Sequence, residues 1–281
     1  MTTLTEHRLR IPGWRDVVLL EGPAGWGEWS PLPGYPADPA VCRRAAEEAA
    51  TVAWPVARRT RVPVNGLVPA VAPDEAAALA AGWVDVKVKV GDAGDVDRVA
   101  AVRDAIGPRG RLRIDANGAW DVETAVATIG RLAPFGLELV EQPVASLEDL
   151  AAVRRRVAVP VAADECVRRL DDARRLADLD AADALVVKVQ PLGGMAAALA
   201  VIDAAGVAAI VSSMYETSVG LSAGLALAAA LDDLPYACGL GTAGLLPADV
   251  VAEPLVPRDG WLAVRRPPPE PALLDRYEVG G

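Results

Sequence analysis

The chain has 281 residues, 52% of them hydrophobic, and a formal net charge of −10. This length is enough for one large core, or for a large domain with a small one, and the negative charge argues against a nucleic-acid-binding protein, which needs a basic face. No apolar run long enough to cross a bilayer is free of charge, and the start of the chain lacks the apolar core of a signal peptide.

The rare reactive residues narrow the chemistry further. Cys42, Cys166 and Cys238 are scattered and form no CxxC motif, which favours a reducing compartment, the cytoplasm. The only histidine is His7, which argues strongly against a Ser-His-Asp triad, a Cys-His pair or a His-ligated zinc site. Acid–base work must therefore fall to Lys, Asp, Glu, Tyr or Cys.

Residues 1–60 differ from the rest and predict a small α+β unit. They contain a strand-like run at 17–22, a Gly/Trp/Pro stretch at 25–35 and an Ala-rich helix near 39–52. We interpret 25–35 as a lid loop. Its amphipathic aromatics, among them Trp26 and Tyr35, either close over a ligand or pack the small unit.

From residue 61 to 248, short apolar strands alternate with helices. We predict strands at 62–70, 83–90, 111–117, 137–143, 159–165, 184–191, 208–214 and 237–243. We predict helices near 73–81, 95–106, 121–133, 146–156, 170–178, 194–205 and 217–231. This α/β pattern favours a closed parallel barrel, with an open doubly wound sheet as the alternative. Residues 249–281 show no eighth helix of the usual kind, and we expect this tail to return to the N-terminal unit.

Lysine is the informative residue type, because only three of 28 basic residues are Lys: Lys87, Lys89 and Lys188. All three lie in apolar, strand-like runs. A lysine can give up its proton in a protein, whereas an arginine cannot, so this choice points to proton transfer or Schiff-base chemistry, or else to chance. Lys87 and Lys89 share one face of their strand, and we expect the first to lower the pKa of the second.

Acidic residues end three successive strands at Asp115, Glu141 and Asp164. In a parallel barrel these ends meet at one mouth, where unpaired carboxylates would repel one another. A hard divalent cation removes that repulsion, and a ligand set without His or Cys favours Mg²⁺ or Mn²⁺. Any single acid could instead cap a helix or pair with an arginine.

The motifs KVK, DANGAW, EQP, DE and KVQPLGG, in this order over about residues 60–245, resemble the muconate-cycloisomerase branch of the enolase superfamily. The resemblance implies a (β/α)7β TIM-like barrel with an α+β capping domain made by the N-terminus and the C-terminal tail. It implies Lys89 as the base and Lys188 across the substrate. It also implies Mg²⁺ on Asp115, Glu141 and Asp164, with Asn117 and Glu165 in support.

Within that branch, GWGEWSPLPGY at 25–35 resembles the capping-domain loop of the o-succinylbenzoate synthases. This implies a Mg²⁺-dependent lyase that dehydrates 2-succinyl-6-hydroxy-2,4-cyclohexadiene-1-carboxylate to o-succinylbenzoate in menaquinone biosynthesis. Lys89 would take the α-proton and return it to the departing hydroxyl, beside the charge of Lys188. The loop holds no arginine for a substrate carboxylate. We expect substrate contacts from Ser212, Ser213, Met214, Gly239, Leu240, Thr242, Trp26 and Tyr35.

Other reactions remain open at this point. The same site would suit an N-acylamino-acid racemase or a muconate-type cycloisomerase, with Lys89 and Lys188 as two bases in the racemase. A Schiff-base aldolase with Lys188 as nucleophile and a barrel that only binds a ligand are further alternatives. We expect a small-molecule carboxylate substrate and no nucleic-acid or membrane partner, and a monomer is compatible with the sequence.

Overall fold

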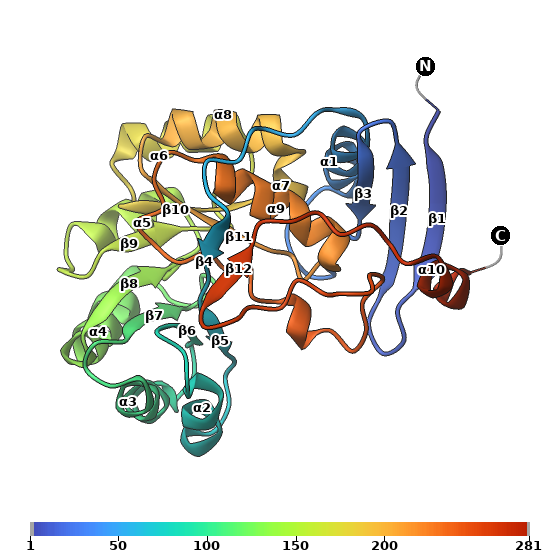
Figure 1. Cartoon of the computed structure of the whole chain (residues 1–281). Coiled ribbons are helices and arrows are strands. Elements are labelled where there is room, and N and C mark those ends of the chain that lie inside the picture. The colour runs from blue at the N-terminus through green and yellow to red at the C-terminus, as the bar shows by residue number, and fades with distance from the viewer. Residues whose placement is uncertain (1–2, 280–281) are drawn as a thin grey trace.

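The computed structural model describes residues 3–279, and its N-terminal part is a three-stranded antiparallel sheet with one helix (Figure 1). These elements are β1 Thr5–Arg10, β2 Asp16–Gly22, β3 Gly25–Trp29 and α1 Pro39–Thr51. The stretch 25–35 is therefore not a loop throughout, because its first five residues pair with β2. Gly27 explains this local fold, since a Cβ there would lie 1.9 Å from the Ala46 carbonyl oxygen of α1.

The larger part is mixed α/β, with a curled parallel sheet whose seven strands run in the order β11-β10-β9-β8-β7-β6-β5. Its elements are β5 Gly66–Val68, α2 Pro73–Ala80, β6 Asp85–Lys89, α3 Asp95–Ile106, β7 Arg111–Asp115, α4 Val122–Leu132, a 3₁₀ turn Ala133–Phe135, β8 Leu137–Glu141, α5 Leu147–Arg154, β9 Val161–Ala163, α6 Leu170–Leu179, β10 Ala184–Lys188, α7 Val189–Leu192, α8 Met195–Ala205, β11 Ala208–Ser212 and α9 Ser218–Ala230. The seven predicted helices are found, with ends within two residues of the prediction.

The period-two pattern of β6 works as predicted. Val86 and Val88 are fully buried in the core cluster, which includes residues of α2 and α3, while Lys87 and Lys89 are partly exposed and lie on the opposite face of the strand. The helices surround the outside of the curled sheet in Figure 1. On the inner face, apolar side chains such as Leu139, Val186 and Ile210 form a small core, and the polar side chains gather at the strand ends.

Three predicted strands differ from the structure. The run 62–70 is interrupted, and its first part is a separate strand, β4 Arg61–Pro63. The run 184–191 leaves the sheet after Lys188, because Pro191 has no N–H for a strand ladder and residues 189–192 form the helical turn α7. The run 237–243 is no strand, and it makes only isolated parallel bridges at Cys238 and Gly239.

These bridges place residues 237–239 between the two edges of the curled sheet. The N–H of Cys238 donates to Pro63 (2.8 Å), and the N–H of Asn65 donates back to Cys238 (3.0 Å). On the other side, the N–H of Gly239 donates to Val211 of β11 (2.9 Å). A short backbone segment therefore contacts both edge regions of the sheet.

The tail after residue 248 contacts both parts of the molecule. Its strand β12, Trp261–Ala263, pairs antiparallel with β4, and its helix α10, Pro271–Tyr277, lies beside β1. A short 3₁₀ turn, Ala243–Leu245, precedes the tail. The Arg266 guanidinium donates to the carbonyls of Ala24, Trp26 and Ala49. Among the helices of residues 3–279, none is long and apolar enough to span a membrane.

Candidate active site

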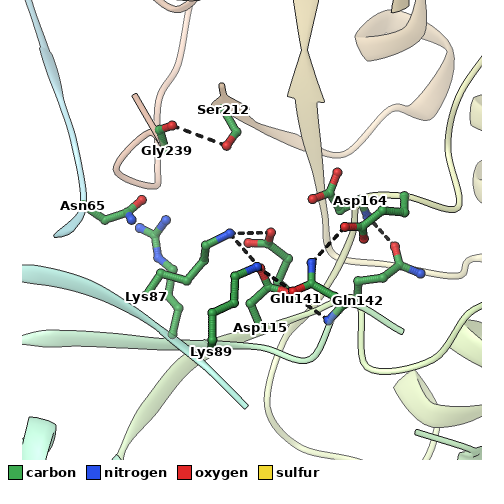
Figure 2. Close-up of polar contacts among 12 residues, drawn as sticks. Asn65, Lys87, Lys89, Asp115, Glu141, Gln142, Asp164, Ser212 and Gly239 are labelled. Atoms are coloured by element: carbon green, nitrogen blue, oxygen red, sulfur yellow. Dashed lines mark hydrogen bonds and ion pairs between the residues drawn. The ribbon is translucent and has the colours of Figure 1, made fainter. Parts of the chain in front are cut away.

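The strand register aligns the charged residues of β6, β7 and β8. Lys89 is opposite Asp115, and Asp115 is opposite Glu141. Lys87 Nζ lies 2.8 Å from Asp115 Oδ2 and 2.7 Å from Glu141 Oε1, and Lys89 Nζ lies 2.5 Å from Asp115 Oδ2. Figure 2 shows both lysines directed at the two carboxylates. The predicted convergence of Lys and acid side chains at these strand ends is present.

Asn117 and Glu165 connect this cluster to the next strand ends. Asn117 adopts a left-handed conformation (φ 47°), which lets its N–H donate to Asp115 Oδ1 at 3.0 Å. Its side-chain oxygen accepts from Lys89 Nζ at 2.6 Å, and its Nδ2 donates to Glu165 Oε1 at 2.8 Å. Asn117 therefore fixes both the lysine and the carboxylate that it contacts.

Lys188 and Asp164 form the second charged group of the site. Lys188 Nζ donates to both carboxylate oxygens of Asp164 and to the Tyr35 hydroxyl at 3.3 Å. The Tyr35 hydroxyl donates in turn to Asp164 Oδ1 at 3.2 Å, and its ring lies 4.6 Å from Lys188 Nζ. A residue of the N-terminal unit thus contacts the lysine at the end of β10.

Burial and charge set the protonation states of these groups. Burial alone would lower the pKa values of Lys87 and Lys188, but the facing carboxylates raise both above the usual range, Asp115 acting most on Lys87 and Asp164 on Lys188. Burial would raise the pKa of Asp115, yet Lys87 and Lys89 hold it below its usual range. Burial, followed by the charge of Asp115, raises the pKa of Glu141 to about 8.

The three carboxylates are each paired with lysine rather than with one another. Within residues 3–279, no group of three or more His, Cys, Asp and Glu side chains is gathered as a metal cluster. Asp115, Glu141 and Asp164 are nevertheless all buried, and Asp115 and Glu141 are opposite each other on neighbouring strands. Buried carboxylate oxygens without a His or Cys among them are a donor set that suits a hard divalent cation.

Gln142 is a residue beside the site that sequence reasoning missed, although it lies within the EQP motif. Its backbone is left-handed (φ 39°), and its Oε1 accepts from the N–H of Asp164 at 2.6 Å. Its Nε2 donates to the Val144 carbonyl at 2.6 Å. Gln142 therefore ties the end of β8 to the backbone that carries Asp164, as Figure 2 shows.

A pocket of about 130 Å³ opens beside the charged cluster. Thirteen of the predicted site residues line it: Tyr35, Lys87, Lys89, Asp115, Asn117, Asp164, Glu165, Lys188, Ser212, Ser213, Met214, Gly239 and Thr242. Five lining residues were not predicted: Leu32, Asn65, Leu67, Tyr215 and Gly241. Glu141 lies outside the lining, paired with Lys87. The wall beyond β11 is made of hydroxyls and backbone, since Ser213 donates to the Gly239 carbonyl and contacts Thr242.

Two of the predicted substrate contacts, Trp26 and Leu240, are not among the residues that line this pocket. Trp26 is opposite Glu21 in the β2–β3 pair and lies against the His7 ring (5.2 Å between centroids), partly buried against a core cluster shared by β1, β2, α9 and the tail. Leu240 is fully buried and does not line this pocket. Of the aromatics in 25–35, Tyr35 reaches the pocket, whereas Trp29 donates to the Pro39 carbonyl.

Glu28 is a buried acid next to, but outside, the charged cluster. Its carboxylate accepts from the Ser30 hydroxyl (2.5 Å), the Thr217 N–H (3.1 Å) and hydroxyl (2.5 Å), and the Gly220 N–H (2.9 Å). Burial raises the pKa of Glu28 to about 7, because it outweighs the hydrogen bonds from Ser30 and Thr217 that lower it. Glu216 raises this pKa further, and Arg15 lowers it.

This raised pKa predicts a pH-dependent stability difference. A carboxyl group with a pKa of about 7 when folded and 4.5 when unfolded binds more protons in the folded state, so its penalty on stability disappears as the pH falls through that window. We expect the free energy of unfolding of the wild type to gain about 2.5 kcal/mol over Glu28→Gln between about pH 8 and pH 5. Urea unfolding at several pH values measures this difference, and parallel curves for the two proteins would contradict it.

Comparison with known proteins places the chain in a family. The family description "Enolase C-terminal domain-like" matches residues 72–270, and "Enolase N-terminal domain-like" matches residues 6–50. The o-succinylbenzoate synthase of Thermobifida fusca (strain YX) is 56% identical over 90% of this chain and 82% of its own length. The o-succinylbenzoate synthase of Mycobacterium tuberculosis (strain H37Rv) is 46% identical over 95% of this chain and 84% of its own length. Among solved structures, the muconate cycloisomerase of Pseudomonas fluorescens has a TM-score of 0.85 at 22% identity, with 99% of this chain and 98% of that chain covered. The chain therefore belongs to the enolase superfamily and, within it, to the o-succinylbenzoate synthase family.

Proposed function

We propose that this protein is an o-succinylbenzoate synthase, a lyase that dehydrates 2-succinyl-6-hydroxy-2,4-cyclohexadiene-1-carboxylate in menaquinone biosynthesis. The observation that carries the proposal is the 56% identity to a named synthase, combined with Lys89 and Lys188 in one pocket. The substrate is a small molecule, and a mouth lined by lysines suits its carboxylates. The free thiols Cys42, Cys166 and Cys238 support the proposal that the protein works in the reducing cytoplasm.

The family implies a divalent metal cofactor, and we propose Mg²⁺, with Mn²⁺ able to replace it. Asp115, Glu141 and Asp164 would hold the ion, because their oxygens are buried on neighbouring strand ends and match its preference for hard ligands. When bound, the ion withdraws charge from the substrate carboxylate and so makes the α-proton easier to remove. Lys87, which bonds both Asp115 and Glu141, keeps these two side chains oriented.

Lys89 is the proposed acid–base residue. As the free amine it takes the proton from the carbon next to the substrate carboxylate. As the ammonium it returns that proton to the departing hydroxyl, so one C–H and one C–O bond break and water leaves. Asn117 Oδ1 holds Lys89 Nζ at 2.6 Å and so orients it for both transfers.

Lys188 is the proposed fixed positive charge. Asp164 and the nearby acids raise its pKa above the usual range, which favours the ammonium form that this role needs. A permanently protonated lysine also makes a poor Schiff-base nucleophile. Its role is to stabilise negative charge that develops on the substrate.

The finer architecture belongs to the same proposal. We propose that the curled sheet closes into a (β/α)7β barrel, supported by the hydrogen bonds of residues 237–239 to both edges. We further propose that residues 61–248 form this catalytic barrel, and that residues 1–60 and the tail 249–281 form its capping domain. Asn117 and Glu165 would support the metal and the base, and Ser212, Ser213, Met214, Gly239, Thr242 and Tyr35 would contact the substrate.

The direct test supplies purified protein and Mg²⁺ with the cyclohexadiene substrate and follows o-succinylbenzoate by chromatography. We expect product formation with a kcat/KM in the usual enzymatic range, above about 10⁴ M⁻¹s⁻¹. Treatment with borohydride plus substrate should leave the activity intact, because no Schiff base forms. Absence of product, or inactivation by borohydride, would contradict the assignment.

A further inference from the structure

The loop formed by residues 30–37 lies over the pocket, and Tyr35 is its contact with Lys188. Its hydroxyl lies 3.3 Å from Lys188 Nζ, and its ring covers that ammonium at 4.6 Å. Tyr35 and Leu32, which also lines the pocket, belong to the same loop. The proposed chemistry uses Lys188 but does not explain how a loop of the N-terminal unit comes to lie over it.

The other end of this loop is fastened to the same segment as Lys188. The N–H of Ser30 donates to Gln190 Oε1 at 3.0 Å, and both groups are buried. Gln190 lies two residues after Lys188, in the turn α7. The loop therefore contacts the end of β10 twice, through Ser30 at its start and through Tyr35 further along.

Glu28 anchors this arrangement to the other wall of the pocket. Its buried carboxylate accepts four hydrogen bonds, two of them from the N–H groups of Thr217, the N-cap of α9, and Gly220 in its first turn. The segment that leads into α9 includes Ser213 and Tyr215, which line the pocket. Glu28 also accepts a hydrogen bond from the Ser30 hydroxyl at 2.5 Å, so its side chain joins the start of the loop 30–37 to the start of α9.

We propose that Glu28 is a positioning residue, which holds the loop 30–37 against α9 so that Tyr35 is placed over Lys188 and closes the substrate pocket. This role assigns a purpose to the Glu and Ser of GWGEWS, and it deepens, and for its kinetic test rests on, the proposed function. Glu28 is not among the residues that line the pocket. Its effect must therefore pass through the loop.

The kinetic test is a double-mutant cycle with Glu28→Gln and Tyr35→Ala at about pH 8, where Glu28 is ionised. In Glu28→Gln the amide keeps the size of the side chain but replaces one acceptor oxygen by a donor. We expect the kcat/KM of this variant to be about tenfold lower than that of the wild type, because one charge-assisted hydrogen bond is lost. If Glu28 acts through Tyr35, the double variant is no slower than Tyr35→Ala alone. Multiplying effects would show that Glu28 supports the fold generally and would overturn the proposal.

A second measurement does not depend on activity. Amide hydrogen exchange without substrate or metal should become faster in residues 30–37 of Glu28→Gln. The control Glu21→Gln, an exposed acid on the neighbouring strand β2, should leave exchange there unchanged. Ser30→Ala removes only the hydroxyl that bonds Glu28, so it should show a smaller change in the same direction and serves if Glu28→Gln folds poorly.

The outcomes separate the two claims. If the wild type has no dehydratase activity but Glu28→Gln exchanges faster only in residues 30–37, the proposed function is contradicted and the positioning role is supported. Unchanged exchange in both Glu28→Gln and Ser30→Ala would remove the positioning role, whatever the wild-type activity.

Discussion

Replacing Lys89 by alanine is expected to lower kcat for dehydration by about 10³-fold or more, with little change in KM. Removal of a general acid–base group costs about 10²–10⁴-fold, and here one side chain serves both proton transfers. Lys89 has no neighbour positioned to replace it, because Lys87 is committed to Asp115 and Glu141 and its pKa lies well above the usual range. Steady-state kinetics with the cyclohexadiene substrate measures the effect.

Lys89→Arg is the matched variant for this prediction. An arginine keeps a positive charge near Asp115 and Asn117 but cannot release its proton. We expect it to be as inactive as Lys89→Ala while it retains more of the wild-type melting temperature. A Lys89→Arg enzyme within tenfold of the wild-type kcat would show that the residue contributes charge and not proton transfer.

The strand ends were predictable because local sequence determines them. A short apolar run at period two, followed by a polar residue, identifies the end of a parallel strand, and the fold brings such ends together. Lys89, Asp115 and Lys188, which the sequence places at such strand ends, all line the pocket. The helices between strands were equally local, with caps such as Asp121 at the start of α4.

The rest of the site depends on contacts distant in sequence. Trp26 looked like a lid residue, but the pairing of β3 with β2, which the Gly-rich stretch hides, places it beside His7, where it is partly buried. Leu240 sits in a run of pocket residues, yet its side chain is fully buried away from the pocket. Gln142 and Glu28 are held by hydrogen bonds to backbone and hydroxyl groups that no periodicity reveals.

Chelation is expected to abolish the dehydratase activity, and added Mg²⁺ or Mn²⁺ to restore it. Asp115, Glu141 and Asp164 are three buried carboxylates on successive strand ends, the oxygen ligands that a hard divalent ion prefers, so the ion should bind there without substrate. At about 100 times its Kd, such an ion stabilises the fold by about 2.7 kcal/mol, which raises Tm by roughly 5 °C. Thermal unfolding with Mg²⁺ alone reports this binding independently of activity.

Glu141→Gln tests whether this carboxylate holds the ion. The amide keeps the shape of the side chain but removes a charge from the trio, so the Mg²⁺-dependent rise in Tm should largely disappear, together with the activity. The control Glu148→Gln changes an exposed acid on the following helix, α5, and should keep both. A full Mg²⁺ response in Glu141→Gln would place the ion elsewhere. A wild type that stays active in EDTA, with no Mg²⁺ response in Tm, would mean that the lysines and carboxylates act as a charge network without a metal.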